Sequence, residues 1–229
     1  MRRATIRIVS TYPWLLDPMP AAVLEALRKG AKLPDMNKGK EAKDVASAKF
    51  YRDNEGYAGI PIDNITACLV EAGRSVKNGK KQISVKDKTT LFELVPNFGP
   101  PFVRFANIPK GKKEPHWVTD VRRGVGHNAN PPVAVAVTRP RLDEVILEPM
   151  VIEYDDARVD LAVLVELFRV AGTSNGLCSG RPNKGRMLFG RFKIVEWKEE
   201  TIATPEDMLV IVRDGVRINR FGQPLEEAA

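Results

Sequence analysis

The chain has 229 residues, of which 43% are hydrophobic and 28% are charged, and its formal net charge is +7. This composition is typical of a globular protein with a buried core, so a disordered chain is not expected. No apolar run reaches the length of about 18 residues that a membrane span needs, and no signal peptide is expected at the N-terminus. The two cysteines cannot form a disulfide framework, so we expect a soluble, cytoplasmic protein.

The first part of the chain predicts a strand followed by two helices of unequal strength. Ile6 and Ile8 alternate with Arg7, as in a half-buried strand. The segment AAVLEALRKGAKL, which follows Pro20, predicts a short helix. A lysine-rich segment from 32 to 49 then predicts a mobile loop and a weak helix.

The clearest helix of the chain lies in the segment IPIDNITACLVEAGRSV. Asp63 is a natural N-cap after Pro61, and Ile65 and Leu69 belong to one apolar stripe. The segment ARVDLAVLVELFRVAG predicts a second long helix, and we expect Gly172 to end it.

Two basic insertions are predicted between these helices. Residues 74–95 carry an Asn-Gly turn and the alternating pair Ile83 and Val85, which predict a basic hairpin. Residues 107–131 lack periodicity and are interpreted as a long loop or finger. Long irregular segments in compact domains are often functional.

The remaining apolar segments predict strands. VAVAVTRPRL and DEVILEPMVIEYDD are expected to pair in antiparallel fashion, RFKIVEW predicts another strand, and DMLVIVRDGVRINRFG predicts a hairpin. The order of elements predicts an α+β fold, with an antiparallel sheet and two main helices on one face. We expect a single domain over residues 1–229 with a ferredoxin-like core, into which the basic hairpin and the finger are inserted.

Basic and acidic side chains are segregated along the chain. Residues 74–88 and 110–123 are rich in lysine and arginine, whereas acids gather in LDEVILE, EYDD and the final PLEEAA. A segregated basic surface favours a polyanionic partner. Trp117 is the best-placed aromatic residue for base stacking, followed by Tyr51 and Tyr57.

Residues 172–197, GTSNGLCSGRPNKGRMLFGRFKIVEW, combine five glycines with cations in front of a strand. The segment lacks the spacing and the hydroxyl of a P-loop, so nucleotide hydrolysis is not indicated. Exposed backbone amides beside cations suit phosphate groups, although a simple crossover between packed elements is the alternative. Arg139 and Arg141 share a strand face, where they could hold phosphates or pair with acids.

Catalytic residues are sparse. His116 and His127 could serve a metal-independent nuclease, or they are ordinary loop histidines. No Cys/His spacing suits a metal, and the adjacent Asp155 and Asp156 do not converge. Cys178 has only neighbouring arginines to lower its pKa. We therefore predict no enzymatic activity, no cofactor and no metal.

Three segments together carry a resemblance to a known family. GYAGIPIDNITACLVEAGR, VTRPRLDEVILEPMVIEYD and the glycine-rich segment resemble phage and prophage proteins of unassigned function. More distantly, the layout resembles the RAMP superfamily of CRISPR-associated RNA-binding subunits, although Asp63-Asn64 and the inserted PNKGRML depart from that pattern. The resemblance implies a nucleic-acid-binding scaffold that oligomerises along a strand without a catalytic centre. It points to Arg139, Arg141, Arg181, Arg191 and the glycines of the segment 172–197.

The sequence therefore predicts a non-catalytic protein that binds single-stranded DNA or RNA and works as a homo-oligomer or as a ribonucleoprotein subunit, away from membranes. One alternative is a RAMP-type RNA endonuclease or a backbone subunit of a CRISPR effector. Another is a structural subunit of a phage particle. The expected nucleic-acid-binding residues are Lys77, Lys80, Lys81, Lys86, Lys112, Lys113, Trp117, Arg122, Arg123, Arg139, Arg141, Arg181, Lys184, Arg186 and Arg191.

Overall fold

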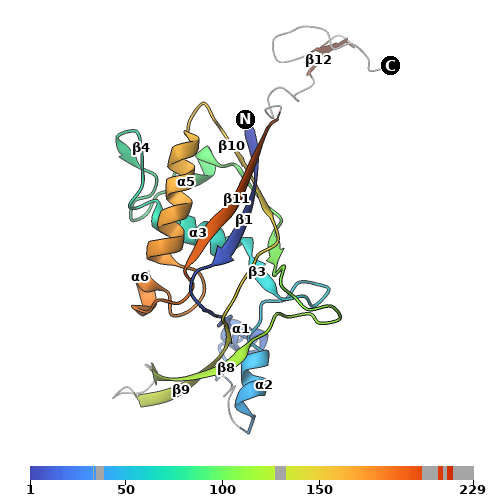
Figure 1. The fold of residues 1–229 in the computed structure, drawn as a ribbon, viewed down its shortest axis with the longest axis vertical. Helices are drawn as coiled ribbons and strands as arrows, with labels where there is room; N and C mark the ends of the chain where they lie inside the picture. Colours follow the sequence, from blue (N-terminus) through green and yellow to red (C-terminus); the bar gives the residue numbers. More distant parts are fainter. Residues whose placement is uncertain (33, 35–38, 127–132, 203–210, 214–215, 219–229) are drawn as a thin grey trace.

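Alternating apolar and polar side chains place β1 (Arg2–Ser10) inside the main sheet of the computed structural model (Figure 1). Its neighbours are β10 (Met150–Tyr154) and β11 (Phe192–Thr201), and β6 (Asn97–Gly99) continues the sheet beyond β10. The strand order is β11-β1-β10-β6, and every pairing in it is antiparallel. The predicted α+β class with an antiparallel sheet is confirmed. The structure describes residues 1–32, 34, 39–126, 133–202, 211–213 and 216–218.

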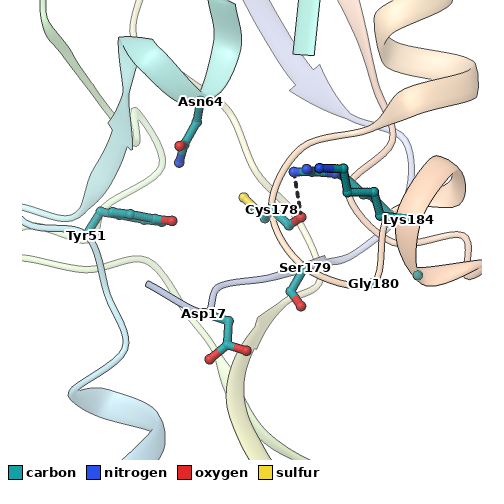
Figure 2. Close-up of a pocket in the computed structure, with 9 residues that line it drawn as sticks. Asp17, Tyr51, Asn64, Cys178, Ser179, Gly180 and Lys184 are labelled. Atoms are coloured by element: carbon teal, nitrogen blue, oxygen red, sulfur yellow. Dashed lines mark hydrogen bonds between the residues drawn. The ribbon is translucent and has the colours of Figure 1, made fainter. Parts of the chain in front are cut away.

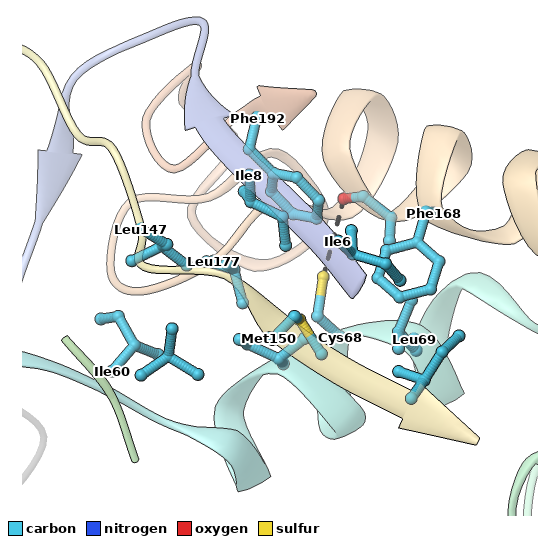
Figure 3. Packing of buried hydrophobic residues seen from close by; sticks show 14 of the residues in the cluster. Ile6, Ile8, Ile60, Cys68, Leu69, Leu147, Met150, Phe168, Leu177 and Phe192 are labelled. Atoms are coloured by element: carbon cyan, nitrogen blue, oxygen red, sulfur yellow. Dashed lines mark hydrogen bonds between the residues drawn. The ribbon is translucent and has the colours of Figure 1, made fainter. Parts of the chain in front are cut away.

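Two helices, α3 (Ile62–Ala72) and α5 (Leu161–Val170), cover one face of this sheet. Figure 3 shows how Ile6 of β1, Cys68 of α3 and Phe168 of α5 meet in the buried core between the helices and the strands. Burial of these apolar stripes is the main force that holds the layers together. The core thus fixes the ends of α3 and α5 relative to the sheet.

The ends of both helices differ from the predicted ones. The N-cap of α3 is Pro61, and Asp63 lies in the first turn without a side-chain capping bond. Gly172 does not end α5, because the chain continues as a π-helical turn, η1 (Ala171–Asn175). A Cβ atom on Gly172 would lie 2.2 Å from the carbonyl oxygen of Phe192, so glycine is needed here for close packing on β11 rather than for helix termination.

Shorter elements surround this core. The predicted short helix after Pro20 and the weak helix before residue 49 are confirmed as α1 (Ala21–Arg28) and α2 (Ala42–Ser47). The predicted last hairpin is confirmed as β12 (Ile211–Arg213) and β13 (Val216–Ile218), while its turn lies outside the described residues. Among the residues described, no helix combines the length and apolarity needed to cross a bilayer. The other short elements are β2 (Trp14–Leu15), β3 (Gly59–Pro61), β4 (Lys77–Asn78), β5 (Lys81–Gln82), α4 (Leu91–Leu94), β7 (Phe102–Arg104) and α6 (Pro182–Gly185).

A long antiparallel hairpin, β8 (Val118–Gly126) and β9 (Val133–Leu142), extends away from the main sheet (Figure 1). The sequence predicts an irregular loop or finger over residues 107–131. The lack of regular structure is wrong for residues 118–126, which form a strand of this projecting hairpin, and residues 127–131 lie outside the described part. Val121 and Arg123 of β8 are both exposed, so this strand has no alternating apolar pattern to reveal it. The expected pairing of β9 with the next strand is also wrong, since β9 pairs with β8 and β2 whereas β10 pairs with β1 and β6.

The face of the main sheet opposite the helices is charged rather than aromatic. Arg3 pairs with Glu153 and Glu200, and Arg7 pairs with Glu196, at N–O distances of 2.7 to 3.2 Å. The aromatic side chains of the four strands all belong to the helix-covered core or pack against it, and they are Phe98, Tyr154, Phe192 and Trp197. On the four strands described, the open face therefore offers paired arginine and glutamate side chains and no aromatic stacking surface.

Candidate functional site

The glycine-rich loop, defined here as residues 176–191, is fastened at several points between η1 and β11. Its two ends are joined because the Leu177 amide donates a hydrogen bond to the Gly190 carbonyl, at 2.8 Å. Its middle is attached to the N-terminal part of the chain, where the Ser179 amide donates to the Leu15 carbonyl at 2.9 Å. The backbone of the loop consequently has a defined shape.

Gly190 is the position at which this shape depends most strongly on glycine. Its φ angle is +76°, and a Cβ atom would lie 1.8 Å from the Leu177 carbonyl oxygen. The loop also holds two non-glycine residues at positive φ, Cys178 at 63° and Arg186 at 52°. Residues in this conformation are strained by about 1–2 kcal/mol each and are enriched at functional sites. Two such residues in one loop make the surface of this loop a candidate functional site.

A pocket of about 390 Å³ lies between the glycine-rich loop, the first turn of α3 and the chain around residue 51 (Figure 2). The loop contributes Ser179, Arg181 and Lys184 to one wall. Tyr51 and Asn64 form the opposite wall, and Figure 2 shows both side chains pointing into the space between the walls. The pocket thus joins segments that are more than a hundred positions apart in the sequence.

The pocket carries excess positive charge. Within the described part of the chain, neither Arg181 nor Lys184 forms an ion pair with a carboxylate. Asp17 is the acidic residue of the lining, and its carboxylate already pairs with Lys49 at 2.8 Å and with Arg139 at 2.7 Å. Two cations therefore balance Asp17, while the charges of Arg181 and Lys184 remain available to an anion.

Two other pocket residues are neutral at pH 7, and burial raises the pKa of both. It raises the pKa of the Cys178 thiol to about 12, and the positive charge of Arg181 opposes this shift only in part, even though some of the cysteine's surface is exposed. Burial also raises the pKa of the Tyr51 hydroxyl, with the Asn64 side chain acting in the opposite direction. At neutral pH the pocket thus presents a protonated thiol and a phenol that can donate a hydrogen bond.

The other two predicted cations of the loop lie outside this pocket. Arg186 is exposed beyond α6. Arg191 lies at the start of β11, where its guanidinium stacks over the Tyr12 ring at 5.5 Å from the centroid, and its Nε atom is buried without a hydrogen-bond partner among the described residues. The structure therefore brings Arg181 and Lys184 together and separates them from Arg186 and Arg191.

Three predicted arginines already have carboxylate partners. The pairs, at N–O distances of 2.7 to 2.8 Å, are Arg122–Asp120, Arg139–Asp17 and Arg141–Asp143. Arg122 also stacks on the ring of Phe189 in the glycine-rich loop, at 4.7 Å, and so links the β8–β9 hairpin to the loop. These contacts correspond to the internal pairing that the sequence left open, and the binding role of the three arginines stays a prediction.

Four of the predicted lysines lie in or beside an exposed hairpin. Residues 74–95 include the short hairpin β4–β5, and its region holds Lys77, Lys80, Lys81 and Lys86, all exposed and without an ion pair in the described chain. In Figure 1 this hairpin and α6 lie on the same side of the molecule.

Further cations lie elsewhere on the surface. Lys112 is exposed, and Lys113 donates to the Glu55 carbonyl and lies over the Tyr57 ring at 5.4 Å. Arg123 is exposed on the β8–β9 hairpin. These three residues do not line the glycine-loop pocket.

Trp117 is half-buried and packs against the core. Its ring meets Phe50 edge-to-face at 5.7 Å, and its Nε1 atom donates to Glu114 at 3.0 Å. These contacts give the ring a packing role, and its proposed stacking on a base stays a prediction.

His116, one of the two histidines considered for a nuclease, lies at a second and smaller pocket. His116 is exposed and lines a space of about 320 Å³ together with Lys43 and Lys112. His127 lies outside the described residues. No three His, Cys, Asp or Glu side chains gather around a common point in the part of the chain that the structure describes.

The sequence predicts the cations on one wall of the glycine-loop pocket, but it predicts little of the opposite wall. Arg181 and Lys184 were identified by their place in a glycine-rich segment. Tyr51 was considered only as a stacking residue, and Asp17 and Asn64 gave no signal of a binding role. Only the fold shows that these residues face the loop.

No protein-family model matches this chain, and no curated protein is significantly similar to it in sequence. The charges and geometry of the glycine-loop pocket are therefore the basis for a functional proposal.

Proposed function

We propose that this protein binds single-stranded DNA or RNA without catalysing a reaction, and that the glycine-loop pocket holds the phosphate backbone. One observation carries the proposal: Arg181 and Lys184 line an open pocket and have no carboxylate partner among the described residues. A guanidinium offers several N–H donors in a fixed plane and an ammonium offers a compact charge, and both suit phosphate oxygens. The Ser179 hydroxyl adds a further donor at the same wall.

The distribution of ion pairs supports a polyanionic partner. Arginines of the sheet and helices, such as Arg3, Arg7 and Arg169, pair with nearby carboxylates. By contrast, the lysines around β4–β5 have no such partners in the described chain. Unbalanced positive charge therefore lies on exposed loops, where it can attract a nucleic acid over a distance of about 10 Å at moderate salt.

We further infer that the core is ferredoxin-like. In chain order β1, α3, β6, β10, α5 and β11 follow a β-α-β-β-α-β plan, and the strand order β11-β1-β10-β6 supports that topology. RNA-recognition motifs of similar plan stack bases on sheet aromatics, whereas this sheet keeps its aromatic residues in the core. We therefore assign strand binding to the glycine-rich loop and not to the sheet surface. The proposed kinship with RAMP and phage proteins rests on this topology together with the sequence resemblance.

Assembly in several copies is part of the proposal. The ten-residue strand β11 forms an edge of the main sheet, and edge strands can pair with another chain.

The two cysteines are free thiols, which supports a reducing, cytoplasmic location. A subunit of a phage particle is the remaining structural alternative, for which ordered oligomers without nucleic-acid binding would be the evidence.

A metal-independent RNA endonuclease of RAMP type is the second candidate function. The observation in its favour is the pocket that His116 lines together with Lys43, Lys112 and Glu114, where the imidazole would act as the general base. In this case RNA would be cut in the presence of EDTA, and His116→Ala would abolish the cleavage.

Fluorescence anisotropy with labelled oligonucleotides of about 20 residues tests the proposal. We expect single-stranded DNA or RNA to bind more tightly than the corresponding duplex at low salt, with labelled RNA intact after incubation in EDTA. The absence of binding to every single strand would contradict the proposed function. Cleavage that disappears in His116→Ala would replace it with the endonuclease.

A further inference from the structure

The two walls of the glycine-loop pocket differ in chemistry (Figure 2). The loop wall carries Arg181 and Lys184, which can hold a phosphate group. The opposite wall carries Tyr51 and Asn64, which are neutral and point into the same space. A phosphate group needs only the first wall, so the second wall is left for another part of the ligand.

Tyr51 and Asn64 are suited to a polar but uncharged group. The Tyr51 phenol is protonated at neutral pH, as an ordinary tyrosine is, and burial raises its pKa further, so its O–H can donate a hydrogen bond. The Asn64 carboxamide can donate and accept at the same time, which is the property that lets asparagine recognise the edge of a base. An unstacked base of a single strand presents such an edge with neighbouring donors and acceptors.

Asp17 does not prevent an anion from entering. Its carboxylate is shared by Lys49 and Arg139, which also leaves it with little capacity to bind an additional cation. The volume of about 390 Å³ falls within the range of roughly 300–1,000 Å³ that is typical of pockets for small ligands. A space of this size is larger than a phosphate group needs.

We propose that the pocket binds one whole nucleotide of the strand, with its phosphate at Arg181 and Lys184 and its base edge hydrogen-bonded by Tyr51 and Asn64. This inference rests on the proposed function, because the nucleotide is one unit of the bound single strand. It adds that the protein recognises one base at this position and does not only bind the phosphate backbone.

Isothermal titration of the full chain with small ligands separates the base from the rest of the nucleotide. The ligands are the four ribonucleoside 5′-monophosphates, ribose 5-phosphate and inorganic phosphate, at constant ionic strength. At least one nucleotide should bind about tenfold more tightly than ribose 5-phosphate, as expected for two additional hydrogen bonds. Equal affinity of all four nucleotides and ribose 5-phosphate would overturn the inference.

Two substitutions test whether the additional affinity for a nucleotide comes from Tyr51 and Asn64. Tyr51→Phe removes only the hydroxyl and keeps the ring that packs against the core, and Asn64→Ala removes the carboxamide. Each should reduce nucleotide affinity severalfold and leave the affinity for ribose 5-phosphate unchanged. Thr66→Ala is the matched control, because Thr66 lies on the same helix but bonds the Asp63 carbonyl and does not line the pocket. Unchanged nucleotide affinity in both Tyr51→Phe and Asn64→Ala would contradict the base contact.

Failure of this inference and failure of the proposed function are distinguishable. If no single strand binds, the proposed function fails. If single strands bind with strong salt dependence but no nucleotide binds more tightly than ribose 5-phosphate, the pocket binds the phosphate backbone alone. In that case only the nucleotide inference fails.

Discussion

Replacement of both Arg181 and Lys184 by alanine is expected to weaken the binding of a single-stranded oligonucleotide roughly 30-fold. The physical reason is that these two side chains bring unbalanced charge to the pocket, so their loss removes attraction to phosphate without breaking an internal ion pair. Lys184 is exposed, whereas Arg181 is half-buried and donates one hydrogen bond to the Cys178 carbonyl, at 3.3 Å. The double substitution should therefore cost the fold only about 1 kcal/mol. Anisotropy titration at one fixed salt concentration measures the effect.

The double variant Arg158→Ala with Arg169→Ala is the matched control. It lowers the net charge by the same two units, but each of its arginines lies at an exposed ion pair, with Asp155 or Glu166. We expect it to bind single strands with an affinity within about threefold of the wild type, because both arginines are already paired with carboxylates and neither lines the pocket. Similar losses in the two double variants would show that net charge, and not the pocket, determines affinity.

Gly190→Ala is expected to destabilise the protein by about 3 kcal/mol or more. An alanine would have to adopt a φ of +76°, and its Cβ atom would lie 1.8 Å from the backbone oxygen of Leu177, which cannot move without opening the loop. For a chain of this length the melting temperature should fall by roughly 6–12 °C. Because the loop also positions Arg181, binding of single strands should weaken in the same variant.

Gly111→Ala separates the two causes of the lost stability, which are the backbone strain of a positive φ and the clash of the Cβ atom. Gly111 has a φ of +77°, almost the same as Gly190, but no atom lies within 4 Å of the position that its Cβ would take. Its substitution should therefore show only the backbone strain, about 1–2 kcal/mol. If Gly190→Ala were no more destabilising than Gly111→Ala, the tight closure of the glycine-rich loop would be refuted.

Local patterns in the sequence were sufficient for the main helices and for β1. Ile65 and Leu69 form a helical stripe, and Ile6 and Ile8 alternate as a half-buried strand does, because each of these elements has one face in the core. The strand β8 has no such face, so periodicity could not reveal it. Strand neighbours were not predictable either, because the pairing of β10 with β1 joins residues about 150 positions apart.

The candidate site was only half predictable for a similar reason. Cations within a glycine-rich segment indicate an anion site by their own spacing, so Arg181 and Lys184 could be named in advance. Whether an arginine is already neutralised depends on partners brought by the fold, as with Arg139 and Asp17. The polar wall of Tyr51 and Asn64 likewise exists only after α3 and the loop have packed together.

The dependence of strand affinity on salt tests the central claim most directly. For the wild type, the logarithm of the binding constant should fall linearly with the logarithm of the salt concentration, with a slope of about −2 or steeper, since each phosphate neutralised on a single strand contributes about −0.7. The Arg181→Ala, Lys184→Ala variant should have a slope flatter by roughly 1.4, which corresponds to two lost phosphate contacts. A wild-type slope near zero, or the same slope in the wild type and this variant, would contradict the account.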